Sequence, residues 1–338
     1  MQTKLVVSSS PFLRDASVST RRLMGDVVIA LIPTALAAIW FFGAPALALM
    51  LVSVVFAVLS ELVYEKITHQ KTTIDDLSAV VTGLLLAFNL PANAPWWMAA
   101  IGSIIAIVLV KQMCGIGQNF INPALAARTI LMLSWAGLIA ATALPAGGQL
   151  FGLTTVPVDA VASATPLVSS SYSLWQLFIG DVPGMLGETC KLTLILGGVY
   201  LIVRKVIDWR IPVFFIATAF ILFWIQTGVI YSVESGTDNA LYQILSGGLL
   251  LGAFFMATDY VTSPVSKWGK VVMGIGCAVI LFVIRAYNNS YPEGCSFAIL
   301  FMNVLTPLID KWTMPRTFGA VKPVKAKKSE AKQGGAKA

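Results

Sequence analysis

Ten apolar segments run through the chain, and most are long enough to cross the hydrocarbon core of a bilayer. They cover residues of about 24–42, 46–65, 77–90, 96–112, 123–142, 190–204, 211–231, 240–258, 269–285 and 294–310. Only 12% of the 338 residues are charged and 57% are hydrophobic, whereas about 25% are charged in a typical soluble domain. We therefore expect an all-α polytopic membrane protein with about ten transmembrane helices. This composition excludes a cytosolic enzyme and a disulfide-stabilised secreted domain.

Positive charge is concentrated in one set of loops. With the amino terminus inside, all of the 23 Lys and Arg residues except Lys191 and Arg285 fall on the cytoplasmic side. This count includes Lys111 and Arg128. Because cytoplasmic loops carry an excess of Lys and Arg, the pattern predicts both termini in the cytoplasm and the loop at 143–189 on the outer, periplasmic side.

The same pattern divides the chain into five parts. We expect a cytoplasmic amino-terminal segment, a first membrane repeat of five helices, a periplasmic loop, a second five-helix repeat and a basic, disordered cytoplasmic tail: residues 1–22, 23–142, 143–189, 190–312 and 313–338. The tail is suited to a position near anionic lipid headgroups. The loop is rich in Gly, Pro, Ser and Thr, so we expect it to lack regular structure. A loop of that length is often functional.

Two pairs of segments resemble each other across the chain. Residues 82–88 (TGLLLAF) resemble 247–254 (GGLLLGAF), and 100–103 (AIGS) resemble 274–277 (GIGC). Both pairs are five segments apart, and this odd offset places the two repeats in opposite orientations. Such an inverted five-plus-five repeat encloses a site between broken helices. The alternative is chance similarity among helices rich in Leu and Gly.

In the long loop, small residues fill the approach to one Thr hydroxyl. The stretch is DAVASATPL, with Asp159 six positions before Thr165. An enzyme that attaches a group to this hydroxyl would need such an unobstructed backbone, although a plain turn of small residues is the simpler interpretation. The spacing resembles the flavinylation motif Asp-x-x-Ser-Gly-Ala-Thr in the family of the D subunit of the Rnf ion-translocating oxidoreductase. Ala164 fits the motif, whereas Ala162 and Ser163 replace the usual Ser and Gly.

Three further stretches extend the resemblance over almost the whole membrane region. They are GIGQNFINPA, FMATDYVTSP and YPEGCSFAILFMN, at residues 115–124, 255–264 and 291–303. Each resembles a stretch of this family, which is related to the B subunit of the sodium-translocating NADH:quinone reductase. The first has Phe and Ile shifted, and the second has Tyr260 where Pro is usual.

The resemblance implies a membrane flavoprotein subunit that passes electrons between ferredoxin and NAD, coupled to Na⁺ or H⁺ translocation. A flavin transferase would join FMN through a phosphodiester to Thr165, within a motif that includes Asp159, Ser163 and Ala164. This sequence has no iron–sulfur ligand set and no dinucleotide fingerprint. Partners similar to Rnf subunits A, B, C, E and G, in a bacterial inner membrane, are therefore implied. No catalytic residue, metal site or nucleic-acid partner is expected.

The family also binds a non-covalent riboflavin in its membrane part. Gly115, Gly117 and Pro123 interrupt the chain between the fourth and fifth segments and free backbone N–H groups there. Asn119 and Asn122 each offer a donor and an acceptor for the edge of a ring. The resemblance thus assigns riboflavin to these two residues. The alternative is that both simply cap the following helix.

Two charged residues near segment ends are further cofactor candidates. Asp259 ends the eighth segment on the inner side, where it could contact flavin or a coupling cation. Pairing with Lys267 or Lys270 is the simpler interpretation. Arg285 ends the ninth segment on the outer side, so it is a candidate to bind the FMN phosphate. Pairing with Glu293 is the alternative.

Two acidic residues lie inside the second segment. Glu61 and Glu65 are four positions apart and therefore share one helix face. Glu61 lies a turn deeper, which makes it a candidate ligand for a coupling cation.

Two other classes of protein fit parts of this pattern. An inverted-repeat solute transporter or channel would have the same repeat without flavin, but it has no need for the stretch from Asp159 to Thr165. A structural anchor would lack the polar breaks at 115–123 and 255–264.

Overall fold

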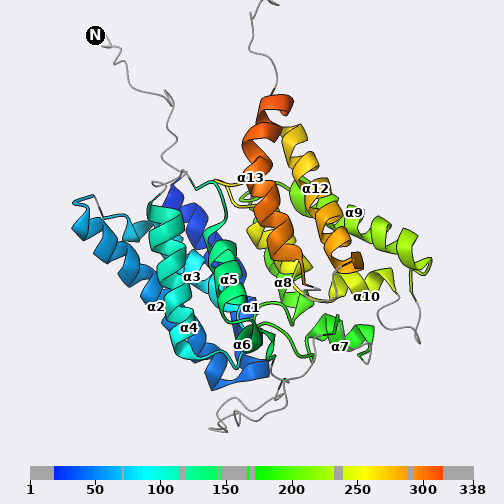
Figure 1. The fold of residues 1–338 in the computed structure, drawn as a ribbon, viewed down its shortest axis with the longest axis horizontal. Helices are drawn as coiled ribbons and strands as arrows, with labels where there is room; N and C mark the ends of the chain where they lie inside the picture. The colour runs from blue at the N-terminus through cyan, green and yellow to red at the C-terminus, as the bar shows by residue number, and fades with distance from the viewer. Residues whose placement is uncertain are drawn as a thin grey trace, which may run out of the picture.

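The computed structural model describes residues 19–70, 72–113, 119–142, 145, 166–167, 172–231, 239–287 and 293–314. Asp159, Ser163, Ala164 and Thr165 lie outside these residues, so their predicted roles stay predictions. The described residues form a bundle of helices with no β-strand, as Figure 1 shows. The all-α fold is confirmed.

The first half of the bundle contains a short 3-10 turn and a π-helical stretch besides its α-helices. In chain order the elements are α1 (Thr20–Phe42), α2 (Ala44–Ile67), η1 (Ile74–Asp76), α3 (Ser78–Phe88), α4 (Trp96–Ile104), the π-helix η2 (Ile105–Gln112), α5 (Pro123–Ser134) and α6 (Ala136–Ala140). The second half has α7 (Leu174–Ile179), α8 (Lys191–Val203), α9 (Arg210–Thr227), α10 (Ala240–Leu245), α11 (Leu249–Leu251), the π-helix η4 (Gly252–Met256), α12 (Lys267–Tyr287) and α13 (Cys295–Thr313).

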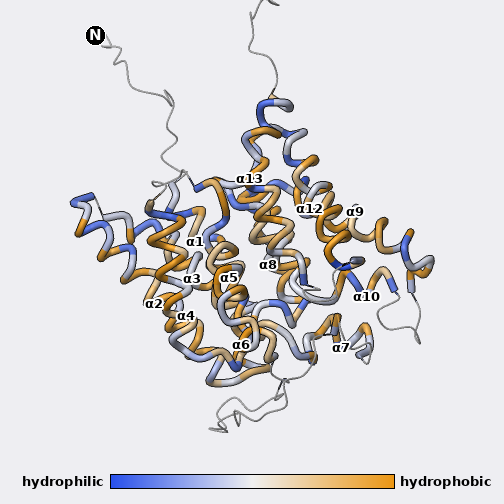
Figure 2. The backbone as a smooth tube through the Cα atoms, in the orientation of Figure 1, coloured by the Kyte–Doolittle hydropathy of each residue, from blue (hydrophilic) through white to orange (hydrophobic). Residues whose placement is uncertain are grey.

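Within the described part of the chain, four helices are long and apolar enough to cross a membrane, namely α1, α2, α9 and α12. Shorter apolar helices cover 78–88, 96–112, 123–134 and 191–203. Hydrophobic side chains remain exposed on the outside of the bundle, for example Leu36 at 61% and Leu51 at 56%, and Figure 2 shows hydrophobic residues along α2, α4 and α5. Lipid rather than water suits these surfaces, and the chain is a polytopic membrane protein.

The start of α1 and the end of α13 lie on the same side of the bundle, at the top of Figure 1. Helices α6 and α7 lie at the opposite side, at the bottom of the same view. This arrangement agrees with an even number of crossings.

Contacts between the halves follow the pattern of a two-fold arrangement. Helix α1 packs against α8, and α5 packs against α13. These are the pairs that a five-plus-five repeat would relate, and elements near a two-fold axis meet their own counterparts. The contacts therefore support a division into two related halves.

Two apolar segments that look continuous in the sequence are interrupted in the structure. The fifth breaks at Trp135, whose ring packs edge-to-face on Trp97 with 5.3 Å between ring centroids. The eighth breaks between α10 and α11, where Gly247 has a φ of +64°. Glycine adopts this left-handed conformation at little cost, so the chain can turn sharply there.

The expectation of an irregular loop throughout 143–189 is wrong for its last part. Ser173 and Gln176 form a capping box that starts α7. Beyond α7 the backbone enters the bundle, where Gly187 N donates to Phe88 O at 2.9 Å and Leu186 N donates to Leu90 O at 3.1 Å. These bonds attach the connector to the end of α3.

Gly83 allows α3 to approach α2 closely. A Cβ atom on Gly83 would lie 2.9 Å from Val54 Cα and 3.0 Å from Ser53 O.

We expect Gly83→Ala to push α2 and α3 apart and to lower the free energy of unfolding by about 1–3 kcal/mol. This would be measured as a lower melting temperature of the detergent-solubilised protein. The control is Gly137→Ala in α6, where a Cβ atom meets nothing within 4 Å. Equal melting temperatures for the two variants would contradict the close approach.

Candidate functional site

A cavity of about 380 Å³ opens between the two halves of the bundle. The first half contributes α1, η1, α3, η2 and the start of α5, and the second half contributes α8, η4 and residues 258–261. Its volume is within the range of small-molecule sites. Three of the predicted cofactor residues, Asn119, Asn122 and Asp259, line this cavity although they come from distant parts of the sequence.

The two asparagines differ in what their side chains bind. Asn122 is the N-cap of α5, where its Oδ1 accepts from the amides of Ala124 and Leu125 at 3.1 and 3.3 Å. Its Nδ2 donates to Met256 O at the end of η4, at 3.2 Å. The capping interpretation therefore holds for Asn122. By contrast, Asn119 Oδ1 is buried and accepts no hydrogen bond from the described residues, so it is free to accept one from a ligand.

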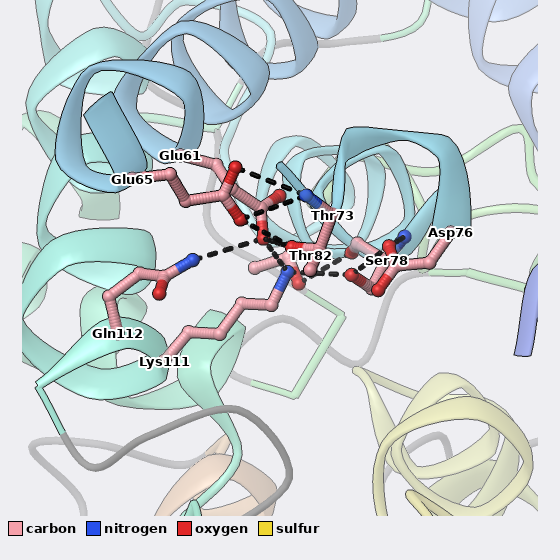
Figure 3. Close-up of polar contacts among 8 residues, drawn as sticks. All are labelled: Glu61, Glu65, Thr73, Asp76, Ser78, Thr82, Lys111 and Gln112. Atoms are coloured by element: carbon pink, nitrogen blue, oxygen red, sulfur yellow. Dashed lines mark hydrogen bonds and ion pairs between the residues drawn. The ribbon is translucent and has the colours of Figure 1, made fainter. Parts of the chain in front are cut away.

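One cationic side chain, Lys111, belongs to the described wall of the cavity. Its ammonium donates to Glu61 Oε1 and to Ser78 Oγ, each at 2.6 Å (Figure 3). Glu61 also accepts from Gln112 Nε2 at 3.1 Å, and Glu65 accepts from the Thr73 amide. Glu61 is thus bound by a buried lysine. Because we counted Lys111 among the residues of the cytoplasmic loops, we did not predict its ion pair with Glu61.

Asp259 faces the cavity without an ion pair among the described residues. Its Oδ2 accepts from Thr262 Oγ1 at 3.3 Å. Burial raises the pKa of Asp259, whereas hydrogen bonds from the Val261 amide, the Thr262 hydroxyl and the Tyr260 amide act in the opposite direction.

The suggested ion pair of Asp259 with Lys270 is wrong. Among the described residues, Asp259 forms no ion pair with Lys267 either. Lys270 Nζ instead donates to Asp208 in the α8–α9 loop, at 3.1 Å. Burial acts to raise the pKa of Asp208, but hydrogen bonds from the Arg210 amide and the Lys270 ammonium outweigh it, so this pKa lies below its ordinary value.

A second group of charged side chains lies between the halves, away from the cavity. We call it the buried ion cluster; its members are Arg128, Glu188, Lys191, Arg285 and Glu293. Arg128 is 3% exposed within α5 and forms an ion pair with Glu293, so its assignment to a cytoplasmic loop was wrong. Its guanidinium also lies 3.6 Å from Glu188. Neither oxygen of that carboxylate accepts a hydrogen bond from the described residues.

The other two cations of the cluster bind the backbone at the break between α10 and α11. Lys191 Nζ donates to Gly247 O at 2.8 Å and also to Glu188 O. Arg285 donates to Ser246 O at 3.1 Å and to Gln243 O. The alternative pairing of Arg285 with Glu293 is therefore wrong.

The residue that follows Thr165 lies beside this cluster. Pro166 lines a narrow pocket together with Glu188, Lys191 and Glu293. Tyr242 donates its hydroxyl proton to Pro166 O at 3.1 Å. The residue next to the predicted flavinylation site therefore lies beside the cluster in space.

One feature of the sequence could have indicated the buried ion cluster. Arg128 lies within the fifth apolar segment, which starts at Pro123, and not in a loop between segments. Ionisable residues inside membrane segments are rare, usually face the interior of the bundle and are often functional.

Residues 6–319 match the model of the NQR2, RnfD, RnfE family. The chain belongs to this family. A relative from Acetobacterium woodii, the D subunit of the Na(+)-translocating ferredoxin:NAD(+) oxidoreductase complex, is 44% identical over 97% of this chain and 99% of its own length. The proton-translocating counterpart from Clostridium ljungdahlii is 40% identical over 93% and 96%. The D subunit of an ion-translocating oxidoreductase complex from Escherichia coli is 32% identical over 93% and 98%.

Removing Arg128 would leave two carboxylates of this family member buried without their guanidinium partner. We expect Arg128→Leu to destabilise the protein by about 3–5 kcal/mol, measured by thermal unfolding after solubilisation. The control is Arg204→Leu, because the Arg204 side chain is 42% exposed in its pair with Asp26. That loss should stay below about 1 kcal/mol. A smaller loss for Arg128 than for Arg204 would contradict the role of the cluster.

Proposed function

We propose that this chain is the membrane flavoprotein subunit of an ion-translocating ferredoxin:NAD⁺ oxidoreductase complex. It carries FMN bound covalently to Thr165 and riboflavin bound non-covalently in the cavity. The names of the relatives support the role in the complex. The observation that carries the flavin assignment is the cavity itself, which joins Asn119, Asn122 and Asp259 from both halves.

The residues present fit a flavin ring. Most of the described wall is apolar, from Leu23 and Met24 in α1 to Phe254 and Phe255 in η4, which suits the faces of an isoalloxazine. The Oδ1 atom of Asn119 accepts no hydrogen bond from the described residues and would accept one from the ring edge. A flavin bound here would supply one- and two-electron transfer. The chain would position the ring between the two repeats and exclude water from its faces.

The FMN would lie on the opposite side of the bundle, next to the buried ion cluster. Thr165 precedes Pro166, and Pro166 lies beside Lys191. Lys191 and Arg285 would place positive charge near the phosphodiester. Asp159, Ser163 and Ala164 would form the motif that a flavin transferase reads.

The remaining electron carriers would reside on partners similar to Rnf subunits A, B, C, E and G. The described residues hold no group of three or more His, Cys, Asp or Glu suited to a metal. We place the complex in the bacterial inner membrane with both termini of this chain in the cytoplasm and the flavinylated loop in the periplasm. The relatives are named for Na⁺ in one case and for protons in another.

The covalent flavin can be tested on the denatured polypeptide. When the chain is co-expressed with its flavin transferase, its band should fluoresce under ultraviolet light, and Thr165→Ala should abolish this fluorescence. Thr155→Ala, in the same loop, should leave it unchanged. Fluorescence that persists in Thr165→Ala would reject the site, and a dark wild-type band would favour a solute transporter.

The riboflavin site can be tested through Asn119. We expect Asn119→Leu to reduce the acid-extractable riboflavin of the purified complex severalfold, because the free acceptor is lost. Asn93→Leu serves as the control, since Asn93 is exposed and does not line the cavity. An unchanged riboflavin content would remove Asn119 from the site.

A further inference from the structure

The described wall of the cavity carries more negative than positive charge. Its charged side chains are Asp76, Asp259 and Lys111. The Lys111 ammonium is already engaged by Glu61 at 2.6 Å. Two carboxylates thus line the cavity against one ammonium, which is bound by Glu61 outside the described wall, so no cation of that wall is free to bind an anion.

The N-termini of helices would favour a negatively charged ligand in the cavity, but side chains of the protein already bind amide groups there. Helices α1, α3 and α5 begin at the cavity, and helix N-termini favour negative charge. Asp76 Oδ1 accepts from the Ser78 amide at 2.8 Å at the start of α3. Asn122 caps α5, and Ser19 Oγ accepts from the Arg22 amide in α1. These side chains bind one or two amide groups in the first turn of each helix, which a phosphate would otherwise bind.

The buried ion cluster has the opposite balance. Arg128, Lys191 and Arg285 outnumber the carboxylates of Glu188 and Glu293 by one, and Pro166 lies beside them. The two sides of the bundle therefore differ in the sign of the charge that they offer to a ligand.

We propose that Asp76 and Asp259 are specificity residues that restrict the cavity to a phosphate-free flavin. This inference rests on the proposed riboflavin site and adds a physical reason for the choice of ligand. A phosphate monoester carries about −1.5 to −2 charges at pH 7. Asp76 and Asp259 accept hydrogen bonds but form no ion pair among the described residues, so their negative charges repel it in a site of low dielectric. Riboflavin has the same ring and no phosphate, so it enters without this cost. The phosphorylated flavin is confined to the side with excess positive charge.

The test is the identity of the acid-extractable flavin in the intact complex, determined by chromatography. Wild type should release riboflavin. Asp76→Asn and Asp259→Asn should each raise the ratio of FMN to riboflavin roughly tenfold, and the double variant should raise it further. The Asn side chain also has an oxygen that accepts hydrogen bonds, so Asp76→Asn can keep the bond from the Ser78 amide at the start of α3. Asp208→Asn is the matched control, because Asp208 binds Arg210 and Lys270 and does not line the cavity.

Each outcome decides the inference. Riboflavin alone in both single variants and in the double variant would overturn it. Loss of all non-covalent flavin from these variants would also overturn it, because the carboxylates would then hold the ring instead of rejecting phosphate. FMN in the wild-type cavity would reject the selectivity and keep the site, whereas an empty wild-type cavity would reject the riboflavin site itself.

Discussion

The architecture depends on one buried guanidinium that joins the two halves. Arg128 in α5 binds Glu293 and Ser296 at the start of α13, and it donates to Asn89 Oδ1 at the end of α3 at 3.0 Å. An isolated charge of this kind would be costly in a membrane interior. The carboxylates around it offset that cost only while α3, α5 and α13 keep their relative positions. The interaction thus fixes the geometry of the segments that also enclose the cavity.

Much of the fold follows from the sequence. The ten apolar segments correspond to the helices or interrupted helices of the structure, and the third segment, at 77–90, forms the short helix α3. The breaks within the fifth and eighth segments were harder to predict. A ring contact such as Trp97 with Trp135 joins residues that no local pattern connects.

The site was predictable only in part. Motifs identified Asn119, Asn122 and Asp259, and the structure brings them to one cavity. The partners of the buried charges were missed, because the count of loop charges treats every Lys and Arg as a loop residue. The pair of Arg128 with Glu293 joins positions 165 residues apart. No spacing rule reaches that far, and only the packing of α5 on α13 makes the contact possible.

The π-helical stretch η2 has a consequence for how the family can vary. A π-turn holds one residue more than an α-turn, so η2 behaves as an insertion retained within a helix. Loss of one residue between Ile105 and Val110 would let this stretch relax to a regular helix. Because the wider turn absorbs this extra residue, the side chains that follow would keep about their present orientation, whereas loss of one residue from a regular α-helix would rotate them by about 100° around the axis. This short stretch can therefore lose one residue with less disturbance than the α-helices beside it.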